Sequence, residues 1–93
     1  MKITLLIDGK EKTYEAPFIS ARKLKKTLQL SEKVQSGITD EIMDELAEYE
    51  VSLYGNQFTA DELLDGYEAS KFFNKVLEDL EKIIGDFDLS VKN

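Results

Sequence analysis

The segment KITLLIDGKEKTYEAP, residues 2–17, decides the fold class of this chain. Apolar residues alternate with other residues along its first half, which is typical of a strand with one covered face. Asp8-Gly9 is a strong signal for a two-residue hairpin turn, and Pro17 ends the return strand. The sequence therefore predicts an N-terminal β-hairpin over residues 1–17.

Two registers of this hairpin fit the sequence. A tight two-residue turn pairs Ile3 with Tyr14, whereas a four-residue loop pairs Leu5 with Tyr14. Either register places these residues on one face together with Ile7. Because a lone hairpin is only marginally stable in water, this face must cover helices or meet further strands.

A first helix is predicted over about 21–29. Ser20 is suited to the N-cap, and Ile19 and Leu24 have the spacing of a hydrophobic staple. Leu24 and Leu28 are expected to face inward. The first turns carry four bases: Arg22, Lys23, Lys25 and Lys26. Bases have the wrong sign for the positive end of a helix, so we expect an acidic neighbour.

Two further helices follow a polar linker at 31–37. The first begins at the cap Thr39 and stops at Gly55. Its inward residues are Ile42, Leu46, Tyr49 and Leu53. Thr59 then begins a short helix with a capping box, and this helix ends at Gly66.

The last helix, over about 68–84, has the strongest apolar periodicity in the chain. Its stripe consists of Phe72, Phe73, Val76, Leu77, Leu80, Ile83 and Ile84. In places the stripe covers more than half of the helix circumference, so part of it is expected to face a partner. Gly85 closes the helix and residues 86–93 form a tail. We therefore expect one α+β domain over 1–93, mostly α, with the hairpin packed against three to four helices in 20–85.

Composition excludes several classes of function. The 93 residues suffice for one domain, and 42% of them are hydrophobic, so the chain can fold. The absence of cysteine and histidine excludes disulfides, Cys/His zinc sites, and Ser–His or Cys–His catalysis. No nucleotide-binding glycine motif is present, and we expect no cofactor. No apolar run is long enough to span a membrane and no signal-peptide pattern is found, so a soluble, cytoplasmic protein is expected.

Charge is distributed unevenly along the chain, whose formal net charge is -7. Residues 1–26 carry seven bases against three acids, whereas residues 35–70 contain no base and ten acids. The acidic middle would repel phosphates, so direct nucleic-acid binding is disfavoured.

Five acids follow one face of the helix after Thr39: Asp40, Glu41, Asp44, Glu45 and Glu48. They would either bind calcium, mimic phosphates, or form an ordinary solvated helix face, and we favour the last. Calcium loops need oxygen ligands on an irregular backbone with a glycine at the bend, and DELLDG lacks that spacing. A hydrolase that uses only carboxylates would need a larger cleft than a chain of this length usually encloses. We therefore predict no metal site and no catalytic residue.

The connector LYGNQFTADELLDGY, residues 53–67, has two interpretations. As scaffold it is a helix end, a connector and a capped short helix, which accounts for all of its residues. As a functional surface it presents an aromatic lip, the surface to test first for partner binding: Tyr54, Phe58, Leu63, Leu64 and Tyr67. Replacing Phe58 and Leu64 by alanine should then abolish partner binding and leave the circular dichroism unchanged.

The basic first helix and the acidic second helix also have two interpretations. They pair within one chain, or head to tail between copies as a weak homo-oligomer. The charges concerned are Arg22, Lys23, Lys25, Lys26, Asp40, Asp44 and Glu48. A contact between copies should weaken as salt is added.

Two segments, MKITLLIDGKEKTYEAPFISARKLKKTLQL and LYGNQFTADELLDGYEASKFFNKVLEDL, resemble the tail assembly chaperones of long-tailed phages or prophages of Gram-positive bacteria, the counterparts of the G protein of phage lambda. The likeness covers roughly residues 1–80 and is most specific at PFISAR and YGNQFT. It implies a small, mostly helical, non-enzymatic protein of the host cytoplasm. Such a protein binds the aggregation-prone tape measure protein and helps to recruit tail tube subunits. A longer form made by ribosomal frameshifting is typical of the family, and the tail at 86–93 is where an extension would begin.

An acidic DNA mimic that blocks a DNA-binding enzyme is the alternative function. Such a protein would place its acids in two rows with the spacing of phosphates. The bases at 22–26 argue against this alternative, because they would interrupt the negative surface.

Overall fold

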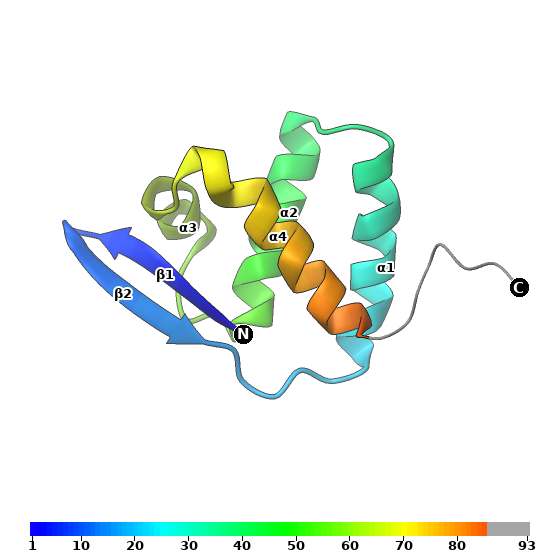
Figure 1. Ribbon diagram of the computed structural model, residues 1–93, viewed down its shortest axis with the longest axis horizontal. Helices are drawn as coiled ribbons and strands as arrows, with labels where there is room; N and C mark the ends of the chain where they lie inside the picture. Colours follow the sequence, from blue (N-terminus) through cyan, green and yellow to red (C-terminus); the bar gives the residue numbers. More distant parts are fainter. Residues whose placement is uncertain (86–93) are drawn as a thin grey trace, which may run out of the picture.

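Within residues 1–85, the part of the chain that this computed structural model describes, an antiparallel hairpin is followed by four helices (Figure 1). The elements are β1 (Lys2–Ile7), β2 (Lys10–Glu15), α1 (Arg22–Gln35), α2 (Asp40–Leu53), α3 (Ala60–Gly66) and α4 (Ala69–Ile84). The expected α+β class, mostly α, is therefore confirmed. The tail expected at 86–93 lies outside the described residues.

The tight turn determines the register of the hairpin. Ile3 pairs with Tyr14, which confirms the first of the two registers. Asp8 and Gly9 have φ angles of 53° and 77°. A two-residue turn of this kind needs left-handed backbone at both positions, and Asp-Gly adopts it at low cost. Ile3 and Leu5 are buried, so the apolar face of the hairpin covers the helices.

The helix α1 begins and ends later than the sequence indicates. Ala21 occupies the N-cap and no side chain caps the helix, so the prediction of Ser20 as the cap is wrong. The Ser20 carbonyl instead accepts a hydrogen bond from the Lys23 amide at 3.0 Å, because the chain already turns before the helix starts. At the other end α1 continues to Gln35, through most of the linker expected at 31–37.

The inward face of α1 also differs from the prediction. Thr27 and Leu30 are buried, whereas Leu24 and Leu28 are partly exposed, so the prediction that these leucines face inward is wrong. Thr27 fits the core because its hydroxyl donates to the carbonyl one turn earlier and is hydrogen-bonded to the Tyr49 hydroxyl of α2. A buried threonine whose hydroxyl is satisfied costs little, and the apolar pattern of a sequence does not reveal it.

The caps predicted for α2 and α3 are confirmed. The Thr39 hydroxyl accepts a hydrogen bond from the Ile42 amide at 3.2 Å. Thr59 and Glu62 form a complete capping box at the start of α3. Beyond α2, Gly55 has a φ of 71°, a left-handed conformation in which glycine is unstrained.

The hydrophobic core lies where the hairpin, α2 and α4 meet. In Figure 1, α4 crosses α2, with the hairpin on one side and α1 on the other. Phe72, Val76 and Leu80 of α4 are buried, whereas Phe73 and Leu77 are exposed. The other buried apolar residues are Ile3, Leu5, Leu30, Leu46, Ala47, Tyr49, Leu53, Tyr54, Phe58 and Leu63. The apolar stripe of α4 is thus wider than the surface that the core covers.

Gly66 allows the end of α3 to lie against β1. A Cβ atom at this position would lie 2.7 Å from the carbonyl oxygen of Leu6 and 3.2 Å from its amide nitrogen. Any side chain here would push α3 away from the strand, because the obstacle is backbone. The close contact therefore helps to hold the hairpin against the helices.

Candidate partner-binding surface

The five residues of the expected aromatic lip lie in different environments. Tyr54, Phe58 and Leu63 are buried in the core, whereas Leu64 is 38% exposed and Tyr67 is half-buried. The five side chains therefore do not form one exposed lip. Leu64 and Tyr67 remain accessible to another molecule.

Phe58 fills the space between the hairpin and the end of α2. Its ring centroid lies 5.0 Å from that of Tyr14 and 5.8 Å from that of Tyr54. The neighbouring Gln57 amide donates to the backbone carbonyls of Glu15 at 2.9 Å and Tyr54 at 2.8 Å. Removing the Phe58 ring would therefore open the core, which argues against the expectation that its replacement leaves the fold unchanged.

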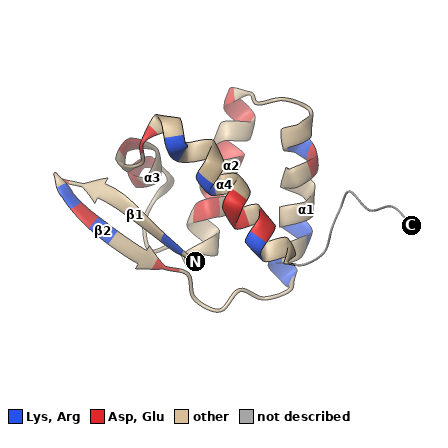
Figure 2. Ribbon diagram, in the orientation of Figure 1, with Lys and Arg blue, Asp and Glu red and all other residues tan. Residues whose placement is uncertain are grey.

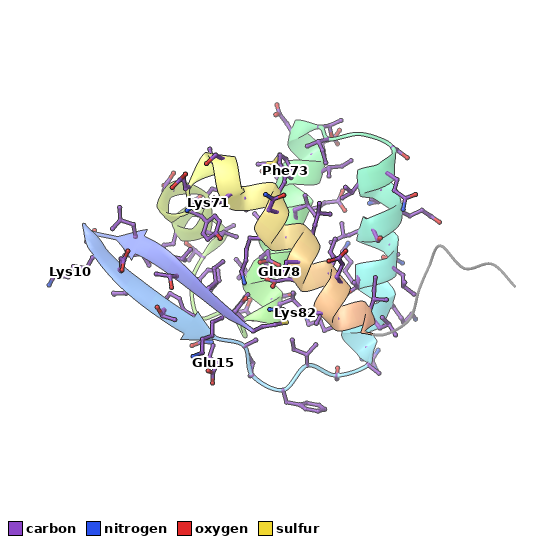
Figure 3. The ribbon with its side chains drawn as sticks, viewed as in Figure 1. Lys10, Glu15, Lys71, Phe73, Glu78 and Lys82 are labelled. Atoms are coloured by element: carbon purple, nitrogen blue, oxygen red, sulfur yellow. The ribbon has the colours of Figure 1, made fainter. Side chains whose placement is uncertain are left out.

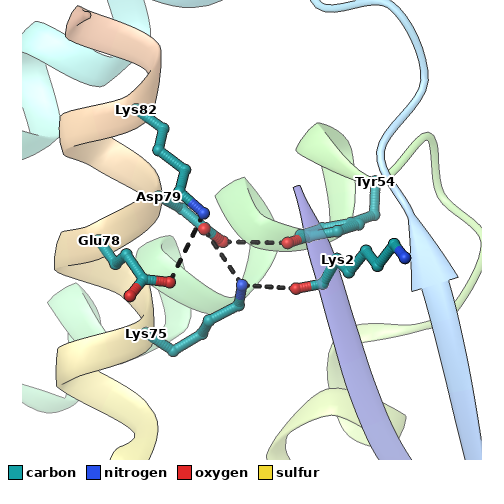
Figure 4. A network of polar contacts seen from close by, with 6 residues as sticks. All are labelled: Lys2, Tyr54, Lys75, Glu78, Asp79 and Lys82. Carbon is teal, nitrogen blue, oxygen red and sulfur yellow. Dashed lines mark hydrogen bonds and ion pairs between the residues drawn. The ribbon is translucent and has the colours of Figure 1, made fainter.

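A buried polar network that the sequence did not predict holds α4 in place (Figure 4). The Asp79 carboxylate accepts a hydrogen bond from the Tyr54 hydroxyl at 3.2 Å and forms an ion pair with Lys75 at 3.2 Å. The Lys75 amine also donates to the backbone carbonyl of Lys2 at 2.6 Å. The network thus ties α4 to the end of α2 and to β1.

Glu50 of α2 is fully buried beside this network. Burial raises the pKa of Glu50 to about 10, assisted by the neighbouring Asp79 carboxylate, while Lys75 acts in the opposite direction. Within the described residues no donor reaches either carboxyl oxygen of Glu50. A carboxyl with this pKa is protonated at neutral pH, so Glu50 is enclosed in its neutral form beside the Asp79 carboxylate.

The acidic neighbour expected for the basic helix α1 is α2 of the same chain. Figure 2 shows bases on α1 and acids on α2. Lys26 and Lys33 approach the Glu45 carboxylate at 3.7 Å and 2.9 Å. The hydrogen bond from Lys33 is the main reason that the pKa of Glu45 is lowered. Of the charges considered for self-association, Lys26 therefore pairs with an acid of its own chain.

The other charges considered for self-association form no ion pair within residues 1–85. They are Arg22, Lys23, Lys25, Asp40, Asp44 and Glu48. All but one of them are exposed, and Lys23 is half-buried. Pairing within the chain therefore accounts for only part of the charge separation along the sequence.

The acids of the described region are poorly arranged for binding an ion or imitating DNA. In residues 1–85, no group of three or more acidic side chains is placed to hold a metal ion. Glu50 points into the core and Glu45 is paired with two lysines, so the row of negative charge along α2 is interrupted. Across the same residues, no helix has the length and apolar character that a membrane crossing requires.

Large apolar side chains are exposed on α1, on α4 and on the segment before α1. Leu24 and Leu28 lie on α1, and Leu77 and Phe73 lie on α4, where Figure 3 labels Phe73. Phe18, in the segment before α1, is 92% exposed. Sequence periodicity signalled the residues of α4 through the width of the stripe, but it assigned those of α1 to the core.

Comparison with known proteins gives one positive finding. The family model described as phage tail chaperone protein matches residues 1–92. No curated protein and no solved structure matches the chain.

Proposed function

The chain belongs to the phage tail chaperone family, and we propose that it acts as a non-enzymatic assembly chaperone that binds the tape measure protein and helps to recruit tail tube subunits. The match over residues 1–92 is the observation that carries this proposal. It agrees with the likeness in the hairpin and in the connector at 53–67. The working place of such a chaperone is the cytoplasm of the infected or lysogenic host cell.

The surface of the protein supports a role in binding another protein. Phe73 and Leu77 of α4, with Leu24 and Leu28 of α1, expose apolar area that the core does not cover. Exposed apolar area on a small soluble domain commonly marks a protein contact. Leu64 and Tyr67, the accessible members of the expected lip, are a second candidate contact.

Co-expression tests the proposed function directly. The tape measure protein from the same genome should be insoluble or aggregated when made alone. It should become soluble and co-purify when this chain is made with it, and adding the tail tube protein should give a complex of all three. If the solubility and elution of the tape measure protein stay the same with and without this chain, the proposal is wrong.

Self-association of the chain is a further part of this proposal. The charges of α1 and α2 that lack partners within residues 1–85 would join copies head to tail. Light scattering should then show a mass that falls as salt is raised from low to high concentration, because salt screens exposed charges. A monomeric mass at high protein concentration and low salt would contradict it.

A further inference from the structure

The β-hairpin has two long edges, and the helices cover only one of them. On the β1 edge, the Lys75 amine donates a hydrogen bond to the Lys2 carbonyl at 2.6 Å. At the other end of β1, a Cβ atom on Gly66 would lie 2.7 Å from the Leu6 carbonyl oxygen, so α3 reaches the backbone of the strand. Figure 1 shows β1 between β2 and α3, with β2 on the outside. The edge of β2 is therefore the open edge of the sheet.

Alternate residues of β2 direct their backbone groups away from the hairpin. In an antiparallel pair, every second residue bonds the partner strand and the residues between them point outward. The Glu15 carbonyl points outward, because it accepts a hydrogen bond from the Gln57 amide at 2.9 Å. By the same alternation, Thr13 and Glu11 also point outward. Their N–H and C=O groups form no hydrogen bond within residues 1–85.

The open part of this edge spans residues 10–13. Gln57 closes the edge at Glu15, and the Asp8-Gly9 turn ends it beyond Lys10. All residues of the open part are exposed. An extended segment that lies beside them would gain hydrogen bonds to both backbone groups of two outward-pointing residues, as in other cases of strand addition.

Charge alternates along the open part. Lys10 and Lys12 lie on the face of the sheet that also contains Tyr14, whereas Glu11 lies on the opposite face. Figure 2 shows the alternating signs on β2, and Figure 3 labels Lys10. These three charges form no ion pair within residues 1–85. An added strand would therefore meet positive side chains on one face and a negative side chain on the other.

These charges disfavour a second copy of β2 as the added strand. Outward residues must oppose outward residues, so a two-fold pairing within the strand is centred on 11, 12 or 13. The first centre places Glu11 opposite its own copy, and the second does the same for Lys12. The third places Glu11 opposite Glu15. Like charges directly opposite one another destabilise a sheet, and charged edge strands are a common protection against pairing between copies.

We propose that the open edge of β2 docks an extended segment of a partner protein, which adds a third strand with acids opposite Lys10 and Lys12 and a base opposite Glu11. The backbone groups of Glu11 and Thr13 supply the hydrogen bonds, and the alternating charges select the segment. This inference goes beyond the proposed function, because an assembly chaperone whose contacts all lie on its helices would not need this edge. If it fails, the proposed function stands.

Two designed peptides test the edge directly. The probe is TVEKEVT with blocked ends, and its control is TVKEKVT, which carries the Lys-Glu-Lys pattern of β2 itself. Both are palindromic, so either strand direction gives the same opposition of charges. The full chain should bind the probe at least about fivefold more tightly than the control. Equal binding of the two peptides would overturn the charge assignment and with it the proposal.

Amide hydrogen exchange locates the bound peptide. The probe should slow exchange at the Glu11 and Thr13 amides, whereas the amides of Lys10 and Lys12 already bond β1 and should change little. Protection centred elsewhere would overturn the assignment. If the Glu11 and Thr13 amides are protected before the peptide is added, another part of the chain or a second copy occupies the edge, and the proposal is refuted.

A matched pair of variants tests the backbone contact. Thr13→Pro removes an outward N–H that the hairpin does not use, and proline is accepted at such edge positions. Thr13→Val keeps the N–H, and both variants lose the hydrogen bond between the hydroxyls of Thr13 and Thr4. Thr13→Pro should weaken binding of TVEKEVT by about tenfold, and Thr13→Val should leave it within about twofold. Equal effects of the two variants would show that no strand is added.

Exchanging the charges tests the choice of partner without altering the backbone. The combined variant Lys10→Glu, Glu11→Lys and Lys12→Glu changes only exposed side chains. It should retain the circular dichroism of the original chain and should bind TVKEKVT at least about fivefold more tightly than TVEKEVT. If the variant keeps the original preference, the charges of β2 do not select the added strand and the proposal is wrong.

Discussion

The two flanks of α4 differ in a way that reverses the usual distribution of charge and apolar area. The flank toward the hairpin contains Lys75 and Asp79, which are almost completely buried and bonded to Tyr54 and to the backbone of β1. The flank toward α1 contains Phe73 and Leu77, which are 38% and 43% exposed. Charge is thus enclosed on one side of the helix, and apolar area is open on the other.

This difference separates what positions α4 from what α4 offers to other molecules. A buried ion pair contributes little net stability, because desolvation offsets its attraction, but removing one partner is costly. Such a network allows one placement of α4 and penalises others. Exposed apolar side chains contribute less to the fold and remain free to contact a partner. Because the network fixes the position of α4, the exposed side chains of Phe73 and Leu77 are held in one arrangement.

The largest effect should follow from removing Asp79. Asp79→Ala leaves Lys75 enclosed without its carboxylate and the Tyr54 hydroxyl without its acceptor, so we expect a loss of about 3–5 kcal/mol in the free energy of unfolding. Urea unfolding followed by circular dichroism measures this loss. The control is Glu78→Ala, which removes an exposed pair with Lys82 at 3.7 Å and should cost less than about 1 kcal/mol. Equal losses in the two variants would show that the buried network does not hold α4.

A similar contrast is expected within the connector at 53–67. Phe58→Ala should lower the free energy of unfolding by about 3 kcal/mol, because it leaves a cavity between Tyr14 and Tyr54. Leu64→Ala should cost about 1 kcal/mol or less, because that side chain is partly in water already. Chemical denaturation of both variants checks the difference. If Phe58→Ala is as stable as the original chain, Phe58 does not support the core and is again a candidate for partner binding.

The protonated state of Glu50 predicts how stability depends on pH. The pKa of Glu50 rises to about 10 in the folded chain from an ordinary value of 4.5, so between these values the folded state holds a proton that the unfolded state has released. This contribution is fully present below about pH 4.5 and is lost as pH rises, by up to about 1.4 kcal/mol per unit. Tyr49 does not interfere, because burial raises its pKa to about 12.

Glu50→Gln should remove this part of the pH dependence. The amide keeps the shape of the side chain and does not titrate. For the original chain, the urea midpoint should be lower at about pH 9 than at about pH 6. For the variant, the difference between the two midpoints should be smaller. Parallel changes in the two proteins would mean that Glu50 is not the group that titrates.

The smallest effect on stability is expected on the open flank of α4. Leu77→Gln should change the free energy of unfolding by less than about 1 kcal/mol, since 43% of the leucine is exposed before the change. Thermal unfolding measures this effect. A large loss of stability would show that the open flank belongs to the core and would remove the contrast between the two sides.

Much of the local structure was predictable from the sequence. The Asp8-Gly9 turn, the Thr39 cap and the capping box of Thr59 with Glu62 form as expected. The N-cap of α1 was not predictable in this way, because Ser20 has a suitable side chain but the preceding backbone turn leaves Ala21 in that place. A cap depends on the path of the chain as well as on the residue type.

The candidate surface was less predictable than the fold. Aromatic residues in a connector suggest a surface, yet Tyr54 and Phe58 are buried because the hairpin closes over them. Asp79 could have indicated the buried network, because it is a charged residue between Val76 and Leu80 on the apolar face of α4. A charged residue within such a face indicates either an exposed edge or a buried network, and the partner that distinguishes the two lies on another element.

The sequence by itself determined the Asp8-Gly9 turn, the caps of α2 and α3 and the presence of each helix, because these depend on residues within about four positions of one another. The tertiary structure alone decided which side of each helix is covered. Tyr54 and Asp79 are 25 residues apart, and Lys2 and Lys75 are 73 apart. Burial depends on which distant side chains meet, and a one-dimensional pattern of polar and apolar residues does not contain that information.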